Sequence, residues 1–283
     1  MTAPASETAT DALTSDGATA PDPVRRVPHP PTARRLTVSA VQDLGPRLRR
    51  VTLTGSDLAG FRAWGPLDHV KVFFPGPQGL VVPVVEEGRW VNREDPALLH
   101  RDYTVRTFDP TVGLVLDMVV HDHGPAGRWT ARAAPGQELA TLGPRGSALP
   151  PLDRDRYVLA ADETGLPALL NWLDRLPTTA DVVAHVEVQD EADELPEEAL
   201  GGHRVTWHHR RGAAPGTTTL LPDAVAGTPL GDGTVWAWAA GETAAVRAIR
   251  TGLAARGLRR DSFAMTGYWR RGVANFDHHS PEA

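Results

Sequence analysis

One short run of the chain carries the residue types that a bound cofactor needs. Arg101, Tyr103, Thr104 and Arg106 fall within six residues, in the order R-x-Y-T-x-R. Apolar Val105 stands between polar neighbours, and a pattern with a period of two is typical of a β-strand. On a strand, Arg101 and Tyr103 share one face, while Thr104 and Arg106 share the other. The run therefore places a cation, an aromatic ring and a hydroxyl on one rigid element.

These side chains suit a ligand that has a phosphate, a flat ring system and ring heteroatoms. Arg101 can pair with phosphate through its planar guanidinium. Tyr103 offers a flat face, and Thr104 offers one donor and two acceptor lone pairs. A flavin meets all three requirements. Taken alone, the six residues favour an exposed strand with ordinary polar faces, because short motifs often match by chance.

Six further segments follow in order along the chain. They are 121–129 (HDHGPAGRW), 135–136 (PG), 143–146 (GPRG), 162–168 (DETGLPA), 238–242 (WAAGE) and 267–272 (GYWRRG). Together with the first run, they resemble the siderophore-interacting protein family over roughly residues 33–273. That family consists of flavin-containing ferric-siderophore reductases of the ferredoxin–NADP reductase-like superfamily. The resemblance implies that FAD is the cofactor.

Composition limits the class of protein. The chain has 283 residues, 41% of them hydrophobic, which is enough for one large domain or two modest ones. Its net charge of −6 disfavours general nucleic-acid binding. It has no cysteine, which rules out disulfides, a thiolate nucleophile and a cysteine-ligated iron–sulfur cluster. With no signal-peptide core and no long apolar run, we expect a cytoplasmic monomer with no membrane insertion.

Two patterns of secondary structure divide the chain. Residues 1–32 lack periodic apolar residues, which predicts a disordered N-terminal arm. Residues 33–150 contain strand-like runs separated by Gly and Pro, which predicts an antiparallel β-barrel that binds FAD. We expect its strands at 36–40, 50–54, 70–74, 101–108, 114–120 and 138–142.

From residue 151 to 273, apolar strands alternate with helices near 166–176 and 243–256. This alternation predicts a parallel sheet with crossover helices. The whole chain is therefore expected to be an α+β two-domain protein, with a flavin-binding barrel followed by an α/β, NAD(P)H-binding-like domain. We expect residues 274–283 to form a flexible tail.

The histidines at 121 and 123 allow two interpretations. H-x-H spacing can bring two imidazoles to a metal, but no third ligand is evident nearby, so we predict no metal site. The resemblance instead implies that His121 and His123 face the flavin diphosphate or adenine. The turn Gly124-Pro125-Ala126 then leads to a helix expected near Gly127, whose exposed amides suit a phosphate. Trp129 is expected either to pack in the core beneath that helix, which we favour, or to contact the flavin as a cofactor-binding residue.

The segment that starts at Asp162 follows a strand and opens a helix. The resemblance implies that NAD(P)H binds here, with Asp162 and Thr164 as contacts and Thr164 as helix N-cap. The helix dipole favours an anion, but Asp162 and Glu163 are anions themselves and would repel a pyrophosphate. The family most often has Ala where this chain has Gly165. The electron donor therefore stays open between NADH, NADPH and ferredoxin.

Basic residues are the candidates for substrate binding, because ferric complexes of catecholate or hydroxycarboxylate siderophores are often anionic. The candidates are Lys71, Arg128, Arg270 and Arg271. The simpler interpretation is that these cations are solvated. We find no constellation for general acid–base, nucleophilic or metal catalysis, so we predict no catalytic side chain and assign the chemistry to the flavin.

The leading hypothesis is reduction of ferric siderophores in the cytoplasm, which releases iron because ferrous iron binds hard oxygen ligands more weakly. Two alternatives remain open at this point. One is another flavin oxidoreductase that passes electrons to free flavin or to a protein. The other is a non-catalytic siderophore-binding iron carrier.

Overall fold

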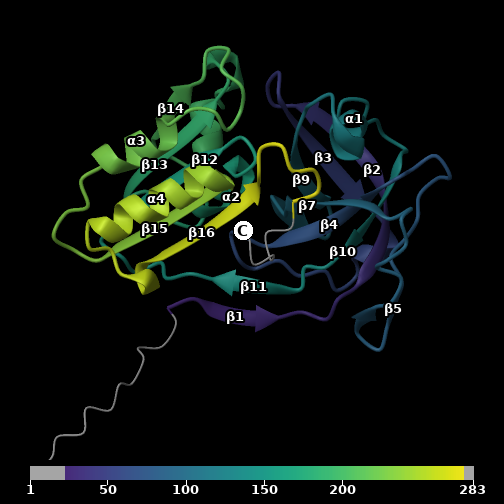
Figure 1. The fold of residues 1–283 in the computed structure, drawn as a ribbon. Helices are drawn as coiled ribbons and strands as arrows, with labels where there is room; N and C mark the ends of the chain where they lie inside the picture. The colour runs from purple at the N-terminus through teal and green to yellow at the C-terminus, as the bar shows by residue number, and fades with distance from the viewer. Residues whose placement is uncertain (1–22, 277–283) are drawn as a thin grey trace, which may run out of the picture.

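Figure 1 shows the computed structural model of the chain, in which residues 23–276 are described. An antiparallel sheet forms one lobe, and a parallel sheet with helices forms the other. This confirms the predicted two-domain architecture. None of the helices in the described part of the chain has the length and apolar character needed to cross a bilayer.

The first lobe is a seven-stranded antiparallel sheet in the order β7-β4-β10-β2-β3-β9-β8. Strands β7 and β8 lie at opposite ends of this order, yet only Val105 and Arg106 separate them in the chain, so the sheet must curl until its ends meet. The Arg106 N–H donates to the carbonyl of Val115 at 2.9 Å. The strands are β2 (Ala33–Asp43), β3 (Leu48–Thr54), β4 (His69–Phe74), β7 (Leu99–Thr104), β8 (Thr107–Asp109), β9 (Gly113–Val119) and β10 (Glu138–Leu142).

Alternate residues of these strands fill the barrel. Val51, Leu53, Val70 and Val72 are all fully buried there, as the period of two requires. Helix α1 (Gly124–Thr130) packs against β4, β7 and β9, and Trp129 lies 5.6 Å from the Phe74 ring. A small hairpin of β5 (Val85–Glu86) and β6 (Arg89–Trp90) projects from this lobe.

A further strand corrects the expectation of a disordered arm. Strand β1 (Arg25–Pro28) pairs with β11 (Gly146–Leu149). His29 follows it, and its ring contacts the Ser147 hydroxyl at 2.8 Å and the Trp64 ring at 5.0 Å. The expectation is wrong for residues 25–28 because their partner lies more than a hundred residues away, where no local pattern reveals it. Residues 1–22 of the expected arm lie outside the described residues.

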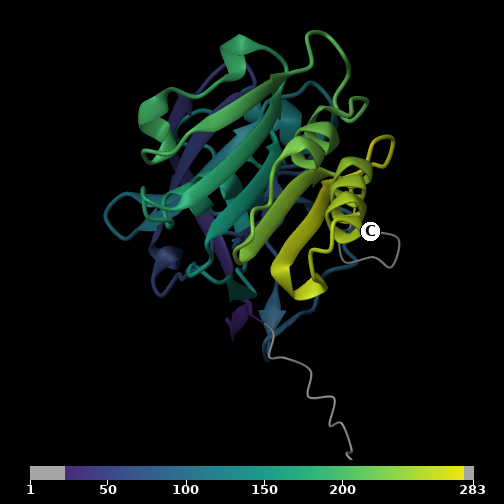
Figure 2. The same cartoon turned by 90° about the vertical axis from the view of Figure 1, so that its left-hand side faces the viewer.

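The second lobe is a parallel sheet in the order β14-β13-β12-β15-β16. Its helices are α2 (Leu166–Leu173), α3 (Leu220–Gly227) and α4 (Thr243–Ala255), and Figure 2 shows α3 and α4 along the outer side of the sheet. Because helices cover both faces, the central strands are almost wholly apolar. The strands are β12 (Arg156–Asp162), β13 (Asp181–Val188), β14 (Val205–His209), β15 (Val235–Glu242) and β16 (Phe263–Trp269). This lobe also has the short 3-10 turns η2 (Glu191–Asp193), η3 (Glu197–Leu200) and η4 (Arg260–Ser262), whereas the turn η1 (Ser56–Leu58) lies in the first lobe.

Arg106 joins the two lobes. Its guanidinium donates to the Asn171 side-chain oxygen at 3.0 Å and to the Asp174 carboxylate at 2.7 Å. The Asn171 amide in turn donates to the carbonyls of Pro66 and Val105, at 3.1 and 2.8 Å. Asn171 is 1% exposed, so the two bonds from its amide form in a dry setting where losing one partner is costly. Helix α2 is therefore fastened to the end of β7.

Candidate functional site

Strand β7 presents Arg101 at the centre of the candidate site. Its guanidinium donates to its neighbour's carbonyl, that of His100, at 2.6 Å and to the Asn275 side chain at 2.8 Å. Among the described residues, no carboxylate forms an ion pair with Arg101. Burial lowers its pKa, as expected for a cation moved out of water. A half-buried guanidinium without an ion pair is a good receptor for a phosphate.

Tyr103 and Thr104 complete the predicted set. Burial raises the pKa of Tyr103 to about 12, and its ring meets Phe74 edge-on at 6.1 Å. Thr104 is 6% exposed, and its hydroxyl shares a hydrogen bond with that of Tyr268 on β16, whose pKa burial also raises to about 12. The second lobe therefore meets the first at the hydroxyl predicted to contact a flavin ring.

His121 carries an unsatisfied buried atom. Its Nδ1 has no hydrogen-bond partner in the described structure, and its ring lies 4.1 Å from that of His123. Burial and then the charge of His123 lower the pKa of His121. A side chain at Gly127 would collide with the His121 imidazole, so glycine is required for α1 to approach it. The helix begins at Gly124, three residues earlier than the expected Gly127.

These features fit FAD. The Arg101 guanidinium, which has no carboxylate ion pair among the described residues, and the hydroxyl of Thr104 match a phosphate and a ring heteroatom. Gly124, Pro125 and Ala126 form the first turn of α1, which contacts β7. Trp129 is 9% exposed and packs on Phe74, so its expected place in the core is confirmed.

The four candidate substrate-binding cations differ in their contacts and exposure. Lys71 pairs with Asp102 at 2.9 Å, beside Arg101 on β7. Arg270 and Arg271 are exposed and follow β16, whose Tyr268 reaches Thr104. Arg128 is exposed on α1, at the barrel.

Asp162 fastens the carboxyl ends of three strands. Its carboxylate accepts hydrogen bonds from the indole of Trp269 at 2.7 Å and from the Glu242 N–H at 2.9 Å. It also accepts from the hydroxyl of Thr164 at 2.6 Å. Thr164 is therefore not the expected N-cap; Gly165 occupies that position, and the Thr164 hydroxyl points back to Asp162 instead. Both residues are engaged within the protein.

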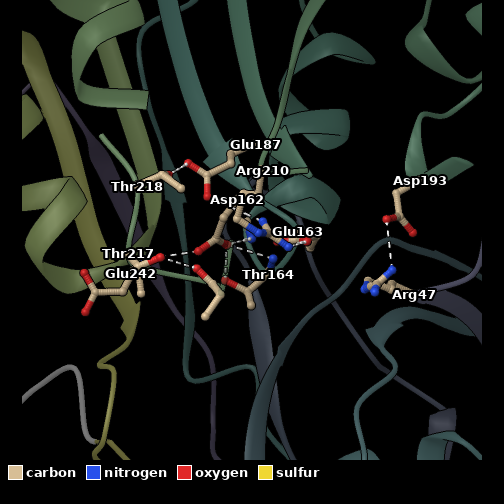
Figure 3. Close-up of polar contacts among 12 residues, drawn as sticks. Arg47, Asp162, Glu163, Thr164, Glu187, Asp193, Arg210, Thr217, Thr218 and Glu242 are labelled. Atoms are coloured by element: carbon tan, nitrogen blue, oxygen red, sulfur yellow. Dashed lines mark hydrogen bonds and ion pairs between the residues drawn. The ribbon is translucent and has the colours of Figure 1, made fainter. Parts of the chain in front are cut away.

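Glu163 also has an internal partner. Figure 3 shows Arg210 donating to the Glu163 carboxylate, with one contact of 2.9 Å, and to Glu187 at 3.4 Å. The Thr218 hydroxyl donates to Glu187 at 2.7 Å. Burial raises the pKa of Glu163 and of Glu187, against the opposing effect of Arg210. The expected repulsion of a pyrophosphate by Glu163 is thus reduced, because its charge is shared with a buried arginine.

Several residues of this site were not singled out from the sequence. Asn171 joins the two lobes, and Arg210 contacts Glu163 and Glu187 at the edge of the parallel sheet. The partners of both residues are far away in the chain. Asp117 is a carboxylate inside the apolar run of β9, and it accepts two hydrogen bonds from Arg50, at 2.7 and 2.8 Å. A charged residue inside an otherwise apolar strand is unusual, and this was the one feature of the sequence that could have singled out Asp117.

Fold and site together define a two-domain flavoprotein of the ferredoxin–NADP reductase type. A ferredoxin reductase of carbazole 1,9a-dioxygenase shares this fold with a TM-score of 0.63 over 85% of this chain and 70% of that chain, at 16% identity. Two family models cover the two lobes: the siderophore-interacting FAD-binding domain at residues 37–148 and the siderophore-interacting protein model at 154–272.

The chain belongs to the siderophore-interacting protein family. It is 38% identical to an NADPH-dependent ferric-chelate reductase of Escherichia coli, over 62% of this chain and 70% of that protein. It is 31% identical to the ferric vibriobactin reductase of Vibrio cholerae, over 82% and 87% of the two chains. A siderophore utilization protein from T. fusca has a TM-score of 0.87 at 48% identity, covering 91% of this chain and all of that one.

Proposed function

We propose that this protein reduces ferric siderophores with bound FAD and so releases ferrous iron in the cytoplasm. The observation that carries the proposal is Arg101, a half-buried guanidinium that has no carboxylate ion pair among the described residues and lies on the strand whose Thr104 meets the second lobe. Ferric-chelate and ferric vibriobactin reductases among the relatives support the same activity.

The chain's own residues bind and orient the cofactor. Arg101 pairs with a phosphate, and His121 and His123 lie beside the diphosphate with the first turn of α1. Tyr103 packs against the ring system, and the Thr104 hydroxyl bonds a ring heteroatom. Bound FAD supplies the ability to accept two electrons and deliver them singly, so no side chain need act as acid, base or nucleophile.

The cations near this site bind the substrate in our proposal. Lys71, Arg270 and Arg271 attract an anionic iron complex toward the junction of the lobes, and Arg128 adds to the positive potential of the barrel. We assign flavin binding to residues 33–150 and donor binding to residues 151–273, in a monomer. The donor is NAD(P)H at the carboxyl edge beside Asp162 and Thr164, or ferredoxin.

Steady-state release of ferrous iron tests this function. The FAD-loaded protein is given NADPH, NADH or reduced ferredoxin together with a ferric siderophore, free flavin or no acceptor, and ferrous iron is trapped by a chromogenic chelator. The proposal predicts turnover with at least one donor and faster consumption of that donor with ferric siderophore than with free flavin. Faster reduction of free flavin would favour a general flavin reductase, and tight siderophore binding without turnover would favour a carrier.

A further inference from the structure

Positive charge is concentrated near the end of the described chain. Residues 243–276 contain one carboxylate, that of Asp261, and seven arginines, at 247, 250, 256, 259, 260, 270 and 271. This segment is therefore strongly positive in a chain whose net charge is −6. It comprises helix α4, the turn η4 and strand β16, which is the edge strand of the parallel sheet.

Three of these residues form what we call the arginine cluster: Arg247 and Arg250 of α4, and Arg260 of η4. Arg250 donates to the carbonyl of Met265 at 3.1 Å, and Arg260 donates to that of Phe263 at 3.5 Å. Positions two apart on a strand direct their carbonyls to the same side. The guanidiniums of Arg250 and Arg260 therefore lie along the open edge of β16, where Figure 2 shows no strand beyond it. The charge of Arg247 acts on Arg250 from the same helix.

The arginine cluster has more charge than its surroundings neutralise. Within residues 23–276, no carboxylate forms an ion pair with Arg247, Arg250 or Arg260. The pKa of Arg250 is lowered by burial and then by the charges of Arg260 and Arg247. Its Nε is buried and has no hydrogen-bond partner in the described structure. An approaching anionic surface would relieve this repulsion.

The cluster also leads toward the candidate flavin site. Met265 and Trp269 are four residues apart on β16, about 13 Å along an extended strand. Arg270 and Arg271 continue the positive charge beyond the strand, next to Tyr268, which reaches Thr104. A partner seated on the arginine cluster would extend along the strand to the junction of the lobes.

We propose that the arginine cluster is the docking surface for a small acidic electron-carrier protein. The span from Arg260 to Arg271 follows the whole of β16 and exceeds the reach of a single iron complex, whereas it matches one face of a small protein. Guanidiniums held by strand carbonyls have already lost much of their rotamer freedom, which lowers the entropic cost of docking. This inference rests on the proposed function, because it names the donor that supplies electrons to that site.

The test uses the full-length, FAD-loaded protein and a plant-type [2Fe–2S] ferredoxin as the acidic probe. Binding of oxidised ferredoxin is measured by calorimetry, and flavin reduction by reduced ferredoxin is followed by anaerobic stopped-flow. The test variant is Arg247→Glu/Arg250→Glu. The matched control is Arg89→Glu/Arg93→Glu, which makes the same change of charge near the β5–β6 hairpin of the barrel.

The test variant should lose at least tenfold in the bimolecular rate at low ionic strength and show a weaker salt dependence, while the control stays near wild type. Arg247→Gln/Arg260→Gln, which keeps the bond from Arg250 to Met265, should lose less in the same direction. Circular dichroism and flavin content report folding.

The proposal is overturned if wild type does not bind ferredoxin, or if test and control variants lose equally. It is also overturned if the test variant loses binding only to vesicles of anionic lipid, which would make the cluster a membrane contact. The same holds if the test variant changes only the KM for a ferric siderophore. Ferredoxin binding and flavin reduction without any reduction of ferric siderophore would leave the docking surface intact and refute the proposed function instead.

Discussion

Arg101 and Arg106 belong to one short run of sequence but have opposite electrostatic surroundings. Arg106 contacts Asn171 and Asp174 and fastens the two lobes. Arg101 has hydrogen bonds to oxygen atoms of neutral groups and no ion pair within the described residues. A half-buried charge that has no ion pair is available to a ligand, and for this reason we assign the phosphate to Arg101.

Replacing Arg101 by Ala should weaken FAD binding. A hydrogen bond to a charged group contributes about 1.5–3 kcal/mol, so the dissociation constant should rise by roughly 10–150-fold. Thr104→Ala removes a neutral hydrogen bond of about 0.5–1.5 kcal/mol and should have a smaller effect. Fluorescence titration of the apoprotein with FAD measures both. Wild-type affinity in Arg101→Ala would show that the phosphate lies elsewhere.

A second prediction concerns His185 in the core of the α/β lobe. Its ring contacts His208 at 3.1 Å and the Thr228 hydroxyl at 2.9 Å. Burial, followed by the charge of His208, lowers the pKa of His185 from 6.5 to about 4. Between these two pH values the unfolded chain binds a proton that the folded protein excludes. The contribution of His185 to the free energy of unfolding is therefore fully present above pH 6.5. It is lost as the pH drops toward 4, by up to about 3 kcal/mol.

Urea unfolding at pH 7, 5.5 and 4.5 measures this loss, with His185→Gln as the comparison. The variant should be less stable at pH 7 but should lose less stability on acidification. Identical losses in the two proteins would show that His185 does not cause the acid sensitivity.

At the scale of elements, local patterns predicted most of the sheets. The strands of the barrel alternate, and those of the α/β lobe are continuous apolar runs, so both types were recognisable from Leu36 to Tyr268. The side chains of β7 that we propose contact FAD could be picked out from the sequence because they are neighbours in it. Local patterns could not predict the pairing of β1 with β11 or the contacts of Arg210 with Glu163 and Glu187. The partners are distant in sequence, and no short-range period encodes them.

Strand β1 gives a prediction at this scale. Deletion of residues 1–22 should leave the melting temperature unchanged, whereas deletion of residues 1–32 removes β1 and the contacts of His29 with Ser147 and Trp64. The hydrogen bonds that are lost contribute about 1 kcal/mol each, and the melting temperature of a protein of this size should fall by roughly 2–4 °C for every kcal/mol lost. Differential scanning calorimetry of the two truncated proteins measures both melting temperatures. Equal melting temperatures would mean that β1 adds nothing to stability.

At the scale of the whole molecule, the two lobes meet where Tyr268 reaches Thr104 and where Arg106 holds α2. In our proposal, the flavin, the anionic substrate and the donor all approach this junction. Charge placed around it should therefore control affinity more than turnover, because it acts on encounter and not on the electron transfer itself.

Neutralising Lys71 or Arg270 by Ala should raise KM for ferric catecholates more than for neutral ferric hydroxamates, with a smaller change in kcat. The difference should shrink with added salt, because the Debye length falls from about 10 Å at 0.1 M to about 3 Å at 1 M. Steady-state kinetics with the two substrate classes measures this. Equal losses for both classes would indicate a general disturbance of the site.

The central claim is that FAD held beside Arg101 and Thr104 passes its electrons to a ferric siderophore. The most direct measurement is anaerobic stopped-flow mixing of the reduced, FAD-loaded protein with a ferric siderophore, with flavin absorbance and ferrous-chelate absorbance recorded together. The account predicts that flavin absorbance returns as ferrous iron appears, with two ferrous ions per FAD, at a rate that rises with siderophore concentration. Flavin that stays reduced while the iron complex binds would contradict it.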